Sequence, residues 1–149
     1  MLKIFDSNSH FLQSTILKKE YFSKIKDYNI CGSNVTFLPD KPLDFLFSNQ
    51  EDLETSFNAI PYFSGDNLNE LTTFFEIYNF NGIKIHPRFS SIDLSNHKLF
   101  NDLFSFACKN KIFIFLCTYY HSNIKYPIVD PLFSISQIKN NFPDLKLVL

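Results

Sequence analysis

The chain has 149 residues, of which 45% are hydrophobic and 19% charged, and its formal net charge is −1. This length predicts a single domain over residues 1–149 with one core, and the composition excludes a disordered chain. The near-neutral charge gives no electrostatic reason to expect nucleic acid or an anionic membrane surface as a partner. No apolar run approaches the roughly 20 residues of a membrane span.

The cysteines and the N-terminus bear on the compartment. Cys31, Cys108 and Cys117 are odd in number and lack CxxC spacing, which suggests free thiols in a reducing compartment. We expect Cys31 and Cys108 to pack as small hydrophobes. No basic region followed by an apolar one opens the chain, so no signal peptide is predicted and the expected location is cytoplasmic.

Residues 1–63 are predicted to contain three strands. They are Leu2–Asp6, Ile30–Leu38 and Ser56–Phe63, each with apolar, β-prone residues and polar or proline-containing ends. Between them, helix is expected towards the end of Phe11–Asp27 and over Leu43–Leu53. The first strand is expected to end in the polar stretch that begins at Asp6.

In the rest of the chain, predicted helices and strands alternate. Helices are predicted over Asn67–Tyr78, His97–Lys109 and Pro131–Asn141, and strands over the stretches that begin at Gly82, Ile112 and Leu145. Gly82 is expected to stop the first of these helices in a left-handed conformation. The unbroken apolar run Ile112–Leu116 predicts a strand that is buried on both faces.

The alternation of strand and helix with short connections indicates the fold class. Such a pattern is typical of an α/β protein with parallel strands and right-handed crossovers. Apart from the connections between elements, no linker, low-complexity segment or exact repeat interrupts the pattern.

One stretch, Gly82–Phe89, places basic residues together. Ile83 and Ile85 alternate with Lys84 and His86, so a strand would put the apolar pair on one face and the basic pair on the other.

The end of the same stretch points to a ligand. Pro87 cannot continue a central strand, so Arg88, the only arginine of the chain, follows the carboxyl end of the strand. Ligands of parallel α/β folds bind at that end. We therefore predict that Lys84, His86 and Arg88 form a basic rim, with a solvated and idle group of charges as the alternative.

Three segments carry a resemblance to a known family. Phe5–Phe11 reads Phe-Asp-Ser-Asn-Ser-His-Phe, where the opening strand of the family commonly reads Ile-Asp-Ser-His-Val-His-Leu. Gly82–Pro87 reads Gly-Ile-Lys-Ile-His-Pro, close to the Gly-Ile-Lys-Leu-His-Pro of its fourth strand. Phe142–Leu149 matches the Phe-Pro-Asp-Leu-Lys-Ile-Val-Leu that precedes an Ala-His pair in family members. In this order, the segments resemble the amidohydrolase-related family of metal-dependent hydrolases.

The resemblance implies a fold and an activity. The expected fold is an incomplete (β/α)8 (TIM-type) barrel of about five and a half βα units, truncated after the sixth strand. The expected activity is that of a metal-dependent hydrolase, or a decarboxylase-like enzyme, acting on a small organic substrate. An anionic substrate would be bound by Lys84, His86 and Arg88.

The resemblance also implies a divalent, zinc-like metal ion, which activates water in such sites. His10 and Asn8 stand at the family's first pair of histidine ligands, and Cys117 stands where a histidine follows the fifth strand. Asparagine is a poor zinc ligand, whereas a thiolate binds zinc well. His121 is a competing donor, with a surface histidine as its alternative. The family's later ligands would follow Leu149, so weak or absent metal binding is expected.

A second reading belongs to another functional class. In this reading, the incomplete ligand set makes the chain a catalytically inactive, degenerate or truncated homologue that would serve as a binding or structural fragment. Open edge strands would also favour self-association, so a homo-oligomer is a further expectation.

Overall fold

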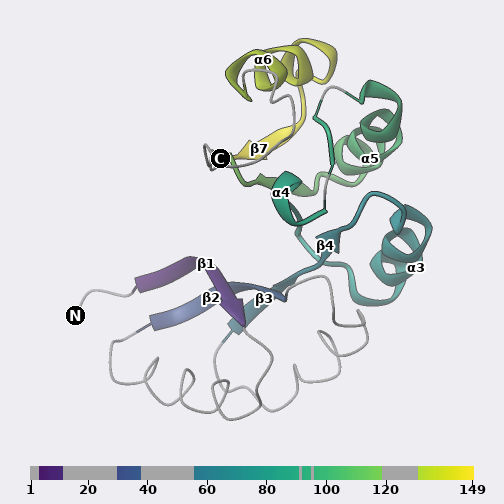
Figure 1. Cartoon of the computed structure of the whole chain (residues 1–149). Coiled ribbons are helices and arrows are strands. Elements are labelled where there is room, and N and C mark those ends of the chain that lie inside the picture. Colours follow the sequence, from purple (N-terminus) through teal and green to yellow (C-terminus); the bar gives the residue numbers. More distant parts are fainter. Residues whose placement is uncertain (1–3, 12–29, 38–55, 91, 95, 119–130) are drawn as a thin grey trace.

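The structure is a computed structural model of the chain and describes residues 4–11, 30–37, 56–90, 92–94, 96–118 and 131–149 (Figure 1). For residues 4–11, 30, 37, 56–57, 88–89, 97 and 131–133 it describes the backbone alone. The helices predicted before Asp27 and over Leu43–Leu53 lie outside the described residues.

The described strands are parallel and follow chain order. One sheet has the order β1-β2-β3 and the other has the order β4-β5-β6-β7. The strands are β1 (Ile4–Phe11), β2 (Ile30–Phe37), β3 (Ser56–Ile60), β4 (Tyr62–Phe63), β5 (Gly82–Ile85), β6 (Phe113–Leu116) and β7 (Lys146–Val148).

Pro61 separates the two sheets within the strand that the sequence predicts as Ser56–Phe63. Proline has no N–H group to give to a ladder, and its carbonyl accepts a hydrogen bond of 2.8 Å from the Lys84 amide. Because only this residue lies between β3 and β4, they form one run that pairs with β2 before Pro61 and with β5 after it. The α/β class with parallel strands is thereby confirmed.

The strands do not close into a barrel among the described residues, since no pairing joins β1 to β7 there. Their parallel direction and sequential order are those of a TIM-type barrel. No helix in the described ranges is long and apolar enough to cross a membrane.

The helices lie along one face of the second sheet (Figure 1). They are α3 (Leu68–Tyr78), α5 (His97–Asn110) and α6 (Pro131–Asn141), and the short helix α4 (Pro87–Ser90) follows β5 directly. Proline suits the first turn of a helix, where its missing N–H costs nothing. Pro87 therefore ends β5, as predicted, and also begins α4.

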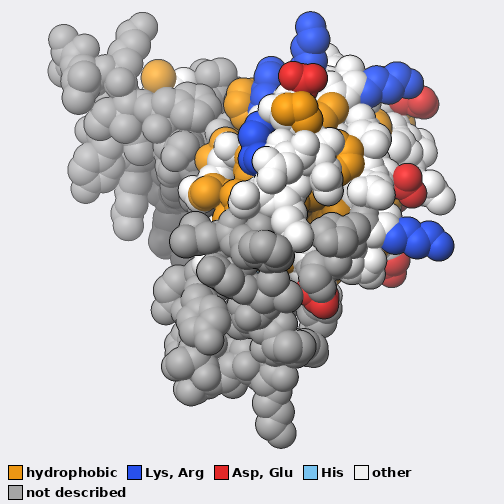
Figure 2. Space-filling view, turned by 90° about the horizontal axis from the view of Figure 1, so that it is seen from above, with side chains coloured by type: hydrophobic (Ala, Val, Ile, Leu, Met, Phe, Trp, Pro, Cys, Tyr) orange, Lys and Arg blue, Asp and Glu red, His pale blue; other side chains and the backbone are white. Residues whose placement is uncertain are grey.

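The opposite face of β6 is less covered than the sequence predicts. Phe113 is 40% exposed and Val148 of β7 is 39% exposed, and apolar side chains reach the surface beside lysines in the view from above (Figure 2). Only Ile114 and Leu116 of β6 are buried, so the prediction of a strand buried on both faces was wrong. An unbroken apolar run does not reveal whether a second layer covers the strand.

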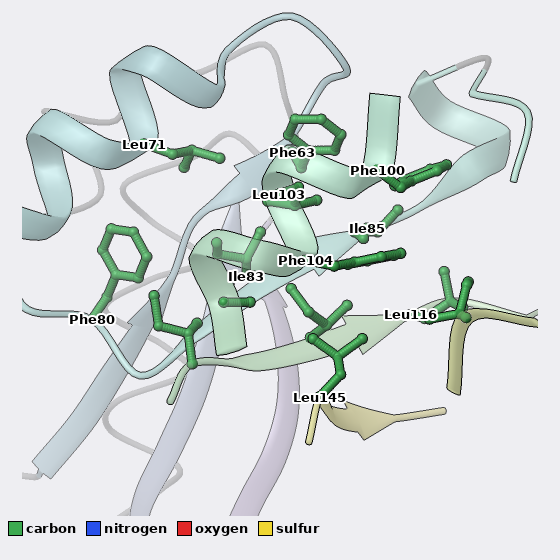
Figure 3. Close-up of a cluster of buried hydrophobic side chains, with 14 of the residues drawn as sticks. Phe63, Leu71, Phe80, Ile83, Ile85, Phe100, Leu103, Phe104, Leu116 and Leu145 are labelled. Atoms are coloured by element: carbon green, nitrogen blue, oxygen red, sulfur yellow. The ribbon is translucent and has the colours of Figure 1, made fainter. Parts of the chain in front are cut away.

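The core lies between β4–β7 and the three long helices (Figure 3). Ile83 and Ile85 of β5 are fully buried in it, as the alternation predicts, together with Leu103 of α5. Aromatic rings fill the spaces between the helices: Phe100 stacks on Phe104 with ring centroids 5.2 Å apart. Fully burying one such side chain is worth about 1.5–3 kcal/mol, so this core is what holds the helices on the sheet.

Two details correct the predicted boundaries. The left-handed residue that ends α3 is Asn79, with φ 48°, because asparagine tolerates this conformation. Gly82 instead lies within β5. The first strand continues past Asp6 to Phe11, because polar residues of β1 keep pairing with β2 after an irregularity between Asp6 and Ser9.

Gly82 is required by packing. A Cβ atom built on it would lie 2.5 Å from Cε2 of Phe115 and 2.8 Å from Cδ1 of Ile60. Phe115 and Ile60 therefore pack directly over the glycine, on the face of the sheet opposite the helices. Throughout the sections below, this face is called the inner face.

Candidate functional site

Lys84 lies on the inner face, opposite Ile83 and Ile85. Its register partners are Tyr62 on β4 and Phe115 on β6, so the three side chains stand side by side on one face of the sheet. Lys84 is only 6% exposed and Tyr62 only 5%. Lysine is seldom buried to this extent, which makes the position unusual for a residue of framework alone.

The carboxyl ends of β5 and β6 meet just beyond Lys84. The amide of Cys117 donates a hydrogen bond of 2.9 Å to the Ile85 carbonyl, which continues the ladder past the last strand residues. His86 and Cys117 are thereby neighbours at this end, and both are half-buried. The Nδ1 atom of His86 is itself buried.

Tyr62 ties the site to α4. Its hydroxyl donates a hydrogen bond of 2.9 Å to the main-chain carbonyl of His86. The hydroxyl of Ser90 lies 2.9 Å from Tyr62 Oη and 3.2 Å from the Phe63 carbonyl, and it can donate to either. The connection from β5 into α4 is thus fixed by side chains of β4 and α4, and the backbone of Arg88 lies within this fixed turn.

Burial shapes the electrostatics of the cluster. It lowers the pKa of Lys84, because the charged ammonium loses its hydration, and the nearby Cys117 opposes this shift. Burial also raises the pKa of Tyr62, with the Ser90 hydrogen bond opposing the rise and Cys117 adding to it. Cys117 therefore lies within electrostatic reach of both groups.

The inner face of the first sheet is polar. The amide of Asn58 donates a hydrogen bond of 3.1 Å to the side-chain oxygen of Asn34, and Thr36 Oγ1 donates one of 2.6 Å to the Ile60 carbonyl. The backbone of His10 is in register with Thr36, so His10 occupies an inner-face position near the carboxyl end of β1.

Asn8 falls within the irregular part of β1, between Asp6 and Ser9, where the register with β2 shifts. Such irregularities re-aim side chains and are frequent beside active sites. The side chains of Asn8 and His10 are outside the described residues, so their predicted metal-binding role stays a prediction.

The described side chains do not fit the implied metal ion. A catalytic zinc ion normally takes three protein ligands, and no group of three or more His, Cys, Asp or Glu in the described part of the chain could hold a metal. We therefore assign no metal ligand to Cys117. His121 lies outside the described residues.

The predicted rim residues are brought together in part. Lys84 and His86 share the carboxyl end of β5, and Cys117 joins them from β6. Arg88 is two residues further on, in α4, with its backbone alone described. Cys108 is half-buried against the core, as expected, whereas Cys31 is exposed, so its predicted packing role was wrong.

Sequence reasoning missed Tyr62 and Ser90. Tyr62 belongs to the predicted strand Ser56–Phe63, and strand alternation alone could have placed it on the same face as Asn58 and Ile60. Pro61 hides this signal, because a proline ordinarily marks the end of a strand. Ser90 became a neighbour only through the turn of α4.

Comparisons with known proteins support the fold. No family model matches the chain, and no curated protein matches it in sequence. Among solved structures, the chain is similar to dihydroorotase from Campylobacter jejuni, known from a 2.4 Å crystal structure, with a TM-score of 0.65 and 13% sequence identity. The match covers 97% of this chain and 46% of that one, so the chain spans about half the length of its structural neighbour. At this identity the likeness shows the fold alone: parallel strands and helices arranged as in part of a TIM-type barrel.

Proposed function

We propose that the chain binds a small anionic organic substrate at the carboxyl ends of β5 and β6, as part of a metal-dependent hydrolase of the amidohydrolase type. The observation that carries the proposal is the burial of Lys84 on the inner face, between Tyr62 and Phe115. Lysine side chains are rarely buried to this extent, and this one lies at the carboxyl-end half of β5. The fold likeness supports the same end of the sheet, because TIM-barrel sites form at the carboxyl ends of the strands.

The proposed roles follow from the chemistry of the side chains. Lys84 supplies a cationic side chain on the inner face, and Arg88, in α4, supplies a guanidinium that suits a carboxylate or phosphate. His86 adds an imidazole, which can donate or accept a hydrogen bond. A partly dehydrated face strengthens each of these interactions with an anion.

The hydrolytic part of the proposal depends on a divalent ion. Such an ion supplies an activated water and polarises the scissile carbonyl in this class of reaction. Because the described donors do not fit a catalytic zinc ion, no step of the reaction is assigned to one here, and His10 is kept as the proposed donor of β1.

A second candidate function is favoured by the described metal donors, which form no three-ligand group. With no three-donor group in the described part of the chain, the protein binds its small anion without hydrolysing it. This candidate keeps the roles of Lys84 and Arg88 and removes the role of the metal.

Calorimetric titration with succinate and with phosphate tests the binding site. Removing a charged anchor typically costs about 2–5 kcal/mol, so Arg88→Ala and Lys84→Ala are each expected to weaken binding at least tenfold. Lys98→Ala, at an exposed lysine of α5, is the matched control and should leave the affinity unchanged. Equal affinities in all variants, or no binding to the wild type, would remove the basic rim from the proposal.

Hydrolysis is tested separately on the zinc-supplemented chain with a panel of carboxylate-bearing amides and cyclic amides. Turnover that Lys84→Ala abolishes supports the hydrolase. Binding without turnover supports the second candidate.

A further inference from the structure

The turn from β5 into α4 is tied to β4 by side chains. The Tyr62 hydroxyl of β4 donates a hydrogen bond of 2.9 Å to the His86 carbonyl. The Ser90 hydroxyl of α4 lies 2.9 Å from Tyr62 Oη and 3.2 Å from the Phe63 carbonyl. This hydroxyl has one proton, which either oxygen can accept, and both choices join α4 to β4. Because Arg88 lies between His86 and Ser90 in the chain, its backbone is held from both ends.

The helix α4 depends on these contacts because it is short. Its four residues form a single turn, and a single helical turn is unfavourable in isolation. The backbone supplies a hydrogen bond of 3.1 Å from the Ser90 amide to the His86 carbonyl and another of 3.1 Å from the Ile92 amide to the Pro87 carbonyl. We therefore expect this turn to open for part of the time when side chains no longer hold it on β4.

Tyr62 is suited to holding the turn. Its side chain is only 5% exposed, so water does not readily replace a hydrogen bond that its hydroxyl loses. Burial also raises the pKa of the phenol, so the hydroxyl keeps its proton and remains a donor at neutral pH. An aromatic ring that only filled the inner face would need no hydroxyl, as Phe115 shows at the corresponding position of β6.

We propose that Tyr62 and Ser90 are positioning residues that pre-organise the turn from β5 into α4 for anion binding through Arg88. The inference rests on the proposed anion site and adds two residues that need not touch the anion. A guanidinium binds a carboxylate or phosphate bidentately only in a defined geometry. The apparent affinity is the intrinsic affinity multiplied by the fraction of molecules in which the turn is formed. Holding the turn before binding therefore increases the affinity without a new contact.

Calorimetric titration of the full chain with succinate and with phosphate tests the proposal, at a temperature where every variant is folded. Tyr62→Phe and Ser90→Ala each remove one hydroxyl. Each is expected to weaken the binding of both anions about two- to tenfold, the range to which the net free energy of one hydrogen bond converts. The control is Ile138→Val, which removes one buried methylene from α6 and lowers stability by a comparable amount. Its affinity should equal that of the wild type.

A double-mutant cycle separates positioning from a loss of stability. In the Arg88→Ala background, Tyr62→Phe should change the affinity little, because the side chain that it helps to place is gone. An equal loss in both backgrounds would make Tyr62 a structural residue and overturn the proposal. The same weakening in Ile138→Val would overturn it as well.

The titrations also separate this inference from the proposed function. No binding to the wild type removes the anion site and, with it, the inference. Binding that Arg88→Ala weakens, but that Tyr62→Phe and Ser90→Ala leave unchanged, overturns this inference alone.

Discussion

The hydroxyl of Tyr62 donates a hydrogen bond of 2.9 Å to the main-chain carbonyl of His86, across the neighbouring strands β4 and β5. The same carbonyl accepts the Ser90 amide at 3.1 Å. Tyr62 thus fixes the point where β5 ends and α4 begins, two residues after the buried Lys84. The residues of the predicted basic rim therefore depend on a tyrosine that lies about 20 residues earlier in the chain.

Removing this hydroxyl is expected to destabilise the protein modestly. Tyr62→Phe leaves the His86 carbonyl with the Ser90 amide and removes a buried hydrogen bond, a loss of about 1 kcal/mol. Urea unfolding of the variant and of the wild type measures the decrease. An unfolding free energy equal to that of the wild type would show that the hydrogen bond adds no net stability.

Gly82→Ala is expected to destabilise the protein by about 1–3 kcal/mol, the usual range for overpacking. The added Cβ would lie 2.5 Å from the Phe115 ring and 2.8 Å from Ile60 Cδ1, so one of the two must move. Thermal unfolding measures the loss. The exposed Asn81→Ala is the control.

A second substitution tests the cause of that loss. In Gly82→Ala with Phe115→Leu, the smaller side chain relieves the overlap, so the cost of Gly82→Ala should be smaller than in the wild-type background. An equal cost in both backgrounds would place the strain elsewhere.

Lys84→Met is expected to stabilise the protein near neutral pH. Because the pKa of Lys84 is lowered in the folded state, the unfolded chain binds the proton more tightly. Burying the charged Lys84 therefore lowers the free energy of unfolding of the wild type by its full amount below the folded-state pKa of this lysine. The free energy of unfolding then rises as the pH approaches the ordinary lysine pKa of 10.5.

The methionine variant lacks this rise, so the difference in free energy of unfolding between the variant and the wild type should become smaller at alkaline pH. Comparing the two proteins cancels the titration of groups whose pKa values the substitution leaves unchanged. Cys117 acts electrostatically on Lys84 and must be included in the fit. Urea unfolding from pH 6 to pH 10 measures the difference, and a constant gap across this range would contradict the prediction.

Zinc is expected to bind weakly. The described donors do not form a three-ligand group, and asparagine at position 8 replaces a good ligand with a poor one. After dialysis against zinc-free buffer, metal analysis should find well under one equivalent per chain. One tightly held equivalent would contradict this prediction, and the variants His10→Ala and Cys117→Ser would then show whether these residues hold the ion.

The sequence by itself determined the order and type of the described elements, apart from α4 and the division of one predicted strand into β3 and β4 at Pro61. Alternation in Gly82–Ile85 predicted which side chains enter the core, because a strand has only two faces and apolar residues fill the one that the helices cover. The stop at Pro87 follows from an equally local rule, and the structure confirms it. The resemblance to amidohydrolases also pointed to the fold that the structural neighbour supports.

Tertiary structure alone decided which residues surround Lys84. Tyr62 and Phe115 come from different strands and flank Lys84 only because parallel pairing sets their register. Ser90 reaches the Tyr62 hydroxyl only because α4 turns back over β4. Gly82 is a second example. Its place after a helix predicts a helix stop, whereas the structure shows that the ring of Phe115, 33 residues later, excludes a side chain at this position. Local propensity acts within a few residues, whereas packing and burial depend on chain segments that only the fold brings into contact.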